Sequence, residues 1–229
     1  MKRGQVKHAL LQGMRSVMGE ARTQRLLLAR NFAAYRRVGV IFVHVPKAAG
    51  STISQALYGR SLGHFSVAEM AGYDAAWFER LPSFAVLRHP VDRTYSAWRY
   101  VRSGGTEEGW IAPRPDYAEP DFAQFDRFVE AWLPQRLARP AELDFVFRPQ
   151  SSYLTGPDGQ PATARLFRLG DWDPLSDYLI ATIGRGLTQT RWRNQNPGGA
   201  PESISPETRQ TLADLYTADM DLFDGLSPG

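Results

Sequence analysis

Short apolar runs in this sequence predict buried strands, and longer segments with helical periodicity predict the helices between them. Residues 38–45 form an unbroken apolar run rich in β-branched side chains, which is typical of a strand covered on both faces. Pro46 and Gly50 interrupt the run, and apolar residues recur at helical spacing from Ser51 onward. The pattern predicts a strand, a tight loop and the start of a helix.

The same arrangement returns farther along the chain. Residues 84–87 predict a second short buried strand, His89 and Pro90 a turn, and the sequence from Val91 a helix with one apolar face. A run at 164–169 predicts a late strand. Further helices are expected over 122–133, near Pro174, and from the Ser205-Pro206 pair through Phe223. Strands that alternate with helices predict a single α/β domain with a central parallel sheet.

Between these elements, residues 103–121 are rich in glycine, proline and acidic side chains and show little periodicity. We expect a long loop here, and long loops in compact domains are commonly functional, for example as a lid over a substrate. The aromatic residues of 122–133 fall on one side of the predicted helix, so we expect them in the core rather than on a sugar-binding surface.

Composition excludes several classes of protein. The chain of 229 residues contains no cysteine and no apolar run near the roughly 18 residues of a membrane span, so we expect neither disulfides, thiolate metal sites nor a spanning helix. No signal-peptide pattern is present, and we expect a cytoplasmic protein. Four scattered histidines argue against a structural zinc site, and no metal is expected. They are His8, His44, His64 and His89.

The net charge of +3 is unevenly distributed. Residues 1–37 contain nine Lys or Arg and only Glu20 as an acid, a net +8, whereas the rest of the chain is net −5. We therefore divide the chain into a basic amphipathic arm, 1–37, and a domain that spans 38–229. One interpretation is that the arm binds nucleic acid or anionic lipid, the latter as a peripheral contact at the inner membrane. We favour the alternative, a helix that packs on the domain and leaves its basic face in solvent.

The loop after the first strand carries the clearest chemistry. A strand followed by a tight loop and a helix N-terminus directs backbone N–H groups and the helix dipole at one place, which suits a phosphate or sulfate. Lys47 adds a cation, and Ser51 and Thr52 add hydroxyl donors. A Walker A loop would place the lysine after the second glycine, whereas here it precedes Gly50. This order weakens the assignment to nucleotide kinases or NTPases.

The loop sequence P-K-A-A-G-S-T resembles the phosphosulfate loop of the carbohydrate sulfotransferase superfamily, which includes the heparan 2-O and chondroitin 4-O enzymes and bacterial relatives. The resemblance implies a P-loop-like sulfotransferase core that holds the 5′ end of the sulfuryl donor PAPS (3′-phosphoadenosine 5′-phosphosulfate). The implied donor-binding residues of the loop are Lys47, Ala48, Ala49, Gly50, Ser51 and Thr52. The alternative is a tight strand-helix turn with a solvated lysine.

A second stretch resembles the 3′-phosphate motif of the same family, an arginine followed eight residues later by a serine. Arg88 and Ser96 have this spacing, while His89 replaces the usual Asp or Asn. A phosphate dianion suits a permanent, forked cation together with a hydroxyl donor. The alternative is a strand-end arginine in a surface ion pair.

Relatives also carry a Gly-His pair between the two motifs, matched here by Gly63 and His64. The resemblance implies that His64 is the base for the acceptor hydroxyl, a task that suits a pKa near neutrality. The alternative is that His64 is a structural or surface residue. Glu69 is a weaker candidate for the base.

Later matches are weaker. Pro149, Gln150 and Tyr153 match a P-Q-x-x-Y segment that lies near the acceptor side in the family. Arg191 and Arg193 fall where relatives have a loop that closes over the nucleotide, and we expect them to contact the donor; a solvated basic loop is the alternative.

These features predict a PAPS-dependent O-sulfotransferase that releases PAP, acts on a carbohydrate or glycolipid hydroxyl and requires no magnesium, since the transferred sulfuryl group carries little charge. No nucleic-acid partner is expected, and the net acidic domain disfavours a polyanionic acceptor. Two other classes stay open. One is a magnesium-dependent kinase or NTPase, and the other is a non-catalytic protein that binds membrane or nucleic acid through the arm. The hydroxyl position and the oligomeric state are left open.

Overall fold

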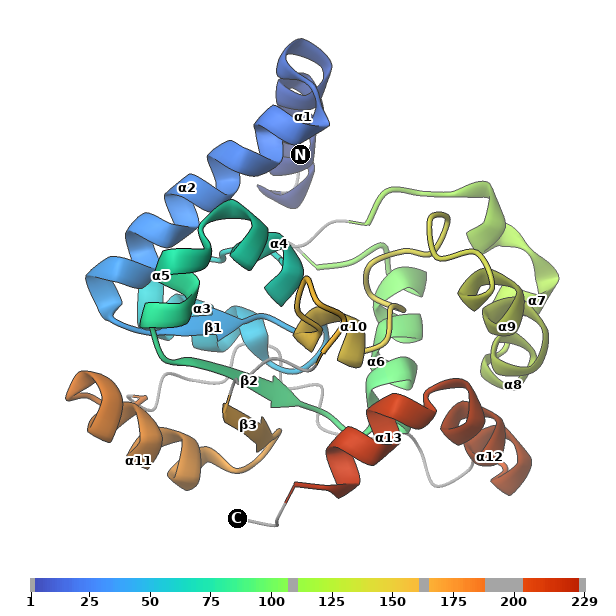
Figure 1. The fold of residues 1–229 in the computed structure, drawn as a ribbon. Helices are drawn as coiled ribbons and strands as arrows, with labels where there is room; N and C mark the ends of the chain where they lie inside the picture. The colour runs from blue at the N-terminus through green and yellow to red at the C-terminus, as the bar shows by residue number, and fades with distance from the viewer. Residues whose placement is uncertain (1–2, 107–110, 161–164, 188–203, 227–229) are drawn as a thin grey trace.

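A three-stranded parallel sheet forms the centre of the molecule in the computed structural model, which describes residues 3–106, 111–160, 165–187 and 204–226 (Figure 1). The strands are β1 (Ile41–Val43), β2 (Ser83–Leu87) and β3 (Arg165–Arg168), in the order β1-β2-β3. The predicted α/β domain with a central parallel sheet is confirmed. All three strands occur where apolar runs predicted them.

The register brings the ends of the first two strands together. Val43 lies opposite Ala85, and Leu87 lies opposite Arg168. Because the strands are parallel, the segments that follow β1 and β2 leave from the same edge of the sheet. Helix α3 (Gly50–Tyr58) begins after the first of these segments and α6 (Pro90–Arg102) after the second.

Strand β1 is shorter than the apolar run 38–45 suggested. Helix α2 (Glu20–Val38) occupies the first residue of the run and ends where Gly39 adopts a left-handed conformation with φ 92°. The N–H of Gly39 then donates to the carbonyl of Tyr35 at 2.7 Å, which closes the last turn. A buried helix end and a buried strand have the same apolar composition, so the run alone could not separate them.

The outer edge of β1 is covered by a side chain of α3. The Tyr58 hydroxyl donates to the carbonyl of Val40 at 2.9 Å and accepts from the N–H of Phe42 at 3.1 Å. The N–H of Ile41 points the other way, to Pro82 on the β2 side. Tyr58 thus satisfies two buried backbone groups that a neighbouring strand would otherwise bind.

Helices α4 (Val67–Tyr73) and α5 (Ala75–Arg80) complete the crossover from β1 to β2, and α11 (Trp172–Ile183) follows β3. Together with the sheet they bury a first hydrophobic core that includes Phe42, Phe84 and Leu179.

A second core lies between α6 and a cluster of short helices. The predicted helix 122–133 is divided, because Gln124 is extended at φ −115°, ψ 139° and the following turns are partly of the wider π form. Its aromatic residues, among them Phe122, Phe128 and Trp132, are buried as expected. The short helices are η1 (Pro115–Ala118), α7 (Pro120–Ala123), α8 (Phe125–Arg127), η2 (Phe128–Trp132) and α9 (Leu133–Leu137).

The C-terminal segment closes both cores. Ser205 caps α12 (Pro206–Leu215) by accepting from the N–H of Thr208 at 3.0 Å, as its sequence predicted. A break at Tyr216, with φ −119° and ψ 37°, separates α12 from α13 (Thr217–Asp224). The short helix α10 (Ser151–Leu154) packs against α13.

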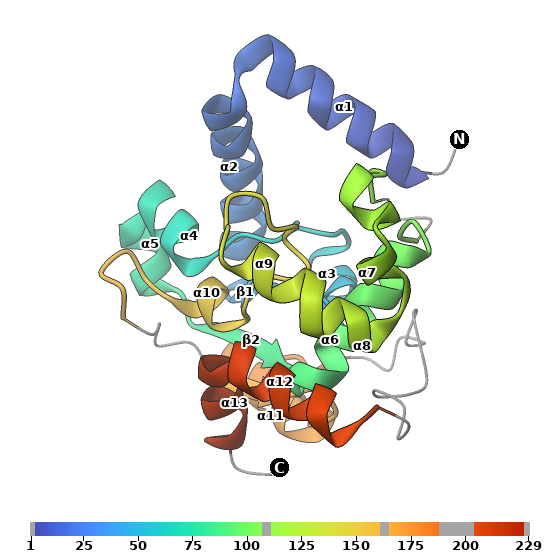
Figure 2. The ribbon, with the colours of Figure 1, turned by 90° about the vertical axis from the view of Figure 1, so that its right-hand side faces the viewer.

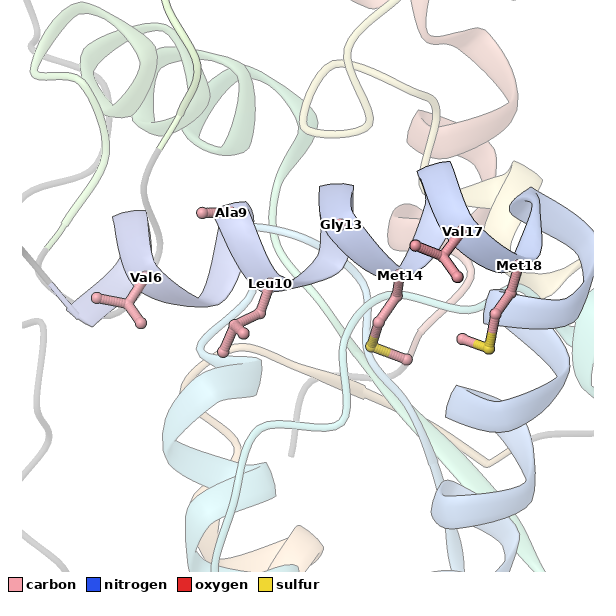
Figure 3. Close-up of a pocket in the computed structure, with 7 residues that line it drawn as sticks. All are labelled: Val6, Ala9, Leu10, Gly13, Met14, Val17 and Met18. Atoms are coloured by element: carbon pink, nitrogen blue, oxygen red, sulfur yellow. The ribbon is translucent and has the colours of Figure 1, made fainter.

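The basic arm has two different environments. Leu28, Phe32 and Tyr35 of α2 belong to the first core, so this half packs on the domain as favoured. Helix α1 (Arg3–Met18) projects from the end of α2 (Figures 1 and 2), and Leu10 and Val17 are 65% and 85% exposed. Its apolar residues line an open hollow along the helix (Figure 3). The packed interpretation fails for α1, and the division at residue 37 stays a prediction.

None of the helices in the described ranges is long and apolar enough to cross a membrane.

Candidate functional site

The loop between β1 and α3 has an unusual backbone. Lys47 and Ala49 both have positive φ, 68° and 58°, a conformation that residues other than glycine rarely adopt. Ala49 caps α3, and its carbonyl accepts from the N–H groups of Thr52 and Ile53 at 3.1 and 3.3 Å. Such strain commonly occurs at ligand-binding sites, because the surrounding structure must enforce it. The predicted strand-loop-helix junction is confirmed as a structure.

Gly50 allows the loop to approach the end of β1 closely. A Cβ atom at this position would overlap the imidazole ring of His44, which is buried. The requirement for glycine is therefore steric and comes from the His44 ring. It is not conformational, because Gly50 has an ordinary helical backbone as the first residue of α3.

The side chain of Lys47 lies against α6. Its Nζ is 3.8 Å from the centroid of the Tyr100 ring, within the range of a cation–π contact. Burial, together with the smaller effect of the positive charge of Arg88, lowers the pKa of Lys47 to about 8. The lysine is held in an environment that disfavours its charge unless an anion is present.

Arg88 leaves the carboxyl end of β2, and Ser96 lies two turns into α6, where it is buried. Burial lowers the pKa of Arg88, an effect that Asp92 opposes and Arg93 reinforces. Tyr100 follows Ser96 by four residues and so shares its helix face. The contact between Lys47 and Tyr100 therefore brings the loop to the helix that carries the second motif.

His64 lies between the end of β1 and the segment after α9. Its ring centroid is 4.0 Å from that of His44 and 4.9 Å from that of Phe145. Nδ1 is 3.1 Å from the carbonyl oxygen of His44. Because a carbonyl only accepts, Nδ1 must carry the proton in the neutral ring, which leaves the lone pair on Nε2. The backbone thus selects the tautomer in which Nε2 can accept a proton.

The competing base, Glu69, has another task. Its carboxylate accepts from the N–H and the hydroxyl of Ser66 at 2.8 and 2.9 Å, and Ser66 in turn accepts from the N–H of Glu69. This reciprocal capping box fixes the start of α4. The S-x-x-E spacing of Ser66 and Glu69 is the sequence signature of such a box.

The P-Q-x-x-Y segment bonds to the end of β2 and to Phe145, which packs on His64, and its expected place near the acceptor stays a prediction. Gln150 bonds to both backbone groups of Arg88, at 3.1 and 2.9 Å. Tyr153 donates from its hydroxyl to the carbonyl of Phe145 at 2.8 Å. Sequence reasoning missed the contact of Gln150 with Arg88, since no local pattern links residues so far apart. Arg191 and Arg193 lie outside the described residues.

Within the described ranges, no group of three or more His, Cys, Asp or Glu side chains could hold a metal ion. The predicted site residues at this end of the sheet are two cations, a hydroxyl and an oriented imidazole. This donor set is suited to an anion and to proton transfer.

A family profile matches most of the chain. The profile described as "Sulfotransferase family" matches residues 30–224, most of the chain. No curated protein and no solved structure matches this chain.

We expect Gly50→Ala to destabilise the protein, because the added methyl group must displace the buried His44 ring. Overpacking of this kind costs about 1–3 kcal/mol, or a fall of roughly 2–12 °C in melting temperature for a chain of this size. Gly72→Ala in α4 is the matched control, since a Cβ there meets nothing within 4 Å. Equal melting temperatures for the two variants in differential scanning calorimetry would contradict the close approach.

Proposed function

The chain belongs to the sulfotransferase family, and from this premise we propose that it transfers the sulfuryl group of PAPS to a hydroxyl group of an acceptor. The observation that carries the proposal is the meeting of two cationic segments at one sheet edge. Lys47 lies in a loop that opens a helix, and the charge of Arg88 is close enough to lower the pKa of Lys47. A nucleotide with phosphates at both its 5′ and 3′ positions would use both cations.

In this proposal the loop holds the 5′-phosphosulfate. Lys47, Ala48, Ala49, Gly50, Ser51 and Thr52 are the residues assigned to it. A helix N-terminus and a lysine both stabilise negative charge on the phosphate oxygen that departs from sulfur. Lys47 is already desolvated, so its charge acts with little screening from water.

Arg88 and Ser96 are assigned to the 3′-phosphate, which is the group that distinguishes PAPS from common nucleotides. Ser96 is buried in α6, and Arg88 is partly buried at the preceding strand end. A charged guanidinium and a hydroxyl are a suitable donor pair for a dianion.

His64 is assigned as the base. The acceptor hydroxyl passes its proton to Nε2 while its oxygen forms a bond to sulfur. The bond between sulfur and the bridging phosphate oxygen breaks, and PAP leaves with the electron pair. The hydrogen bond from Nδ1 to the carbonyl of His44 supports this role, since it orients the ring and stabilises the imidazolium that forms.

For the acceptor, we propose a neutral or weakly charged carbohydrate or glycolipid. Residues 38–229 carry a net charge of −5, which would not attract a polyanion over long range. A heparan-like polysaccharide as the best acceptor would contradict this part of the proposal.

PAP should stabilise the protein without metal, and Lys47→Ala and Arg88→Ala should lose that effect because each removes a phosphate-binding cation. At a hundred times its dissociation constant a ligand adds about 2.7 kcal/mol, or roughly 5–11 °C in melting temperature. Arg30→Ala is a control, since this arginine is exposed on α2. A thermal-shift response to magnesium-ATP and none to PAP would instead support the kinase or NTPase class.

His64→Ala should lower kcat for sulfuryl transfer by about 10²–10⁴, the usual contribution of a general base, with unchanged PAP affinity. Transfer is measured as PAP release from PAPS with neutral oligosaccharides, glycolipids and short alcohols. His8→Ala on α1 is the matched control. Full activity of the His64 variant would assign proton removal to another group.

PAP affinity should be constant from pH 7 to about 7.5 and fall above about pH 8. In the free protein the pKa of Lys47 is lowered to about 8, whereas a bound phosphate raises it, so binding above pH 8 requires uptake of a proton. The phosphates themselves titrate near pH 6. Calorimetric titrations of Lys47→Arg should lack the fall, because arginine stays charged; identical profiles would contradict the assignment.

A further inference from the structure

One side chain fixes the backbone on both sides of Arg88. The buried amide of Gln150 accepts from the N–H of Arg88 at 3.1 Å and donates to its carbonyl at 2.9 Å. These bonds hold the two peptide groups that flank the Cα atom of Arg88. Because the orientation of those groups sets φ and ψ, these bonds help to fix the direction in which the arginine side chain leaves the strand.

Gln150 is itself held by a residue of the C-terminal helix. The carboxylate of Asp219 accepts from the N–H of Gln150 at 2.7 Å and from the N–H of Ser151 at 2.8 Å. Asp219 is fully buried in α13. Hydrogen bonds to a buried carboxylate are stronger than those between neutral groups, so they fix Gln150 firmly.

The buried charge of Asp219 is balanced by Arg93 of α6, whose guanidinium lies 3.9 Å away and is also fully buried. Arg93 donates to the carbonyls of Val146 and Arg148 at 3.0 and 2.8 Å. The hydroxyl of Tyr216 donates to the carbonyl of Phe147 at 2.7 Å. Residues of α6 and α13 therefore hold the segment 146–151 in place, and this segment carries the Gln150 side chain that bonds to Arg88.

We infer that Gln150 is a positioning residue that aims Arg88 at the 3′-phosphate of the donor and thereby sets the preference for 3′-phosphorylated nucleotides. The inference rests on the proposed function. It differs from a general structural role in one measurable respect: a cross-link that only stabilises the fold would affect all nucleotides equally, whereas a residue that aims Arg88 affects only nucleotides with a 3′-phosphate.

The test compares PAP with adenosine 5′-monophosphate, which lacks the 3′-phosphate, by calorimetric titration. Gln150→Met keeps the length of the side chain and removes both bonds to Arg88. We expect it to lower the ratio of PAP affinity to adenosine 5′-monophosphate affinity by at least about tenfold, the size of one charge-assisted contact, with the affinity for the monophosphate unchanged within about twofold. Equal weakening of both nucleotides, or an unchanged ratio, would overturn the inference.

Two further variants identify the pathway. Arg88→Ala should lower the ratio by at least as much, and adding Gln150→Met to it should lower the ratio no further, since both act through one contact. Gln55→Met is the matched control, because Gln55 also bonds to a backbone carbonyl, that of Gly59 at 3.0 Å, but on the exposed face of α3. A full additional loss in the double variant would overturn the inference.

Two outcomes separate the inference from its premise. If the wild-type protein binds PAP no more tightly than the monophosphate, both the inference and the proposed donor site fail. If wild type prefers PAP and Arg88→Ala abolishes the preference while Gln150→Met does not, the inference alone fails.

If Gln150→Met does not fold, Gln150→Glu takes its place. This variant retains the acceptor for the N–H of Arg88 and loses the donor to its carbonyl, and a wild-type affinity ratio in it would overturn the inference.

Discussion

The parallel pairing of β1 with β2 is the constraint on which the candidate site depends. Parallel strands deliver the segments that follow them to one edge of the sheet, where an α/β domain commonly binds its ligand. Here the register of Ile41–Val43 against Ser83–Leu87 places the Lys47 loop beside Arg88. The crossover through α3, α4 and α5 also carries His64 back to the end of β1, so one topological unit supplies all three groups.

Burial gives this edge its chemical character. Lys47 and Arg88 are both desolvated, and burial lowers the pKa of each. Two residues of the loop, Lys47 and Ala49, have left-handed backbone conformations, which cost about 1–3 kcal/mol each. The fold therefore holds positive charge and strained backbone together at one edge of the sheet. An incoming polyphosphate or phosphosulfate would offset the desolvation of the cations, which is how such a site gains affinity from an otherwise unfavourable arrangement.

A good part of the fold was predictable because local signals were strong. The apolar run at 84–87 and the Ser205-Pro206 cap gave an element and a boundary that the structure confirms. Other boundaries were wrong. Gly39 ends a helix inside an apolar run that predicted only a strand, and the extended backbone of Gln124 divides a predicted helix. The exposure of the apolar face of α1 could not be predicted, because periodicity identifies an apolar face but not what covers it.

By itself, the sequence determined the strand-loop-helix units, the family resemblance and the residue types at the site, since these depend on short-range spacing and side-chain chemistry. Only the tertiary structure decided how those residues act together. The carbonyl of His44, just after β1, selects the tautomer of His64. Burial lowers the pKa of Lys47, and hydrogen bonds join Gln150 to Arg88 and Asp219. The physical reason is that desolvation and hydrogen-bond geometry depend on which segments pack together. Contacts between segments far apart in the sequence cannot be read from a local pattern.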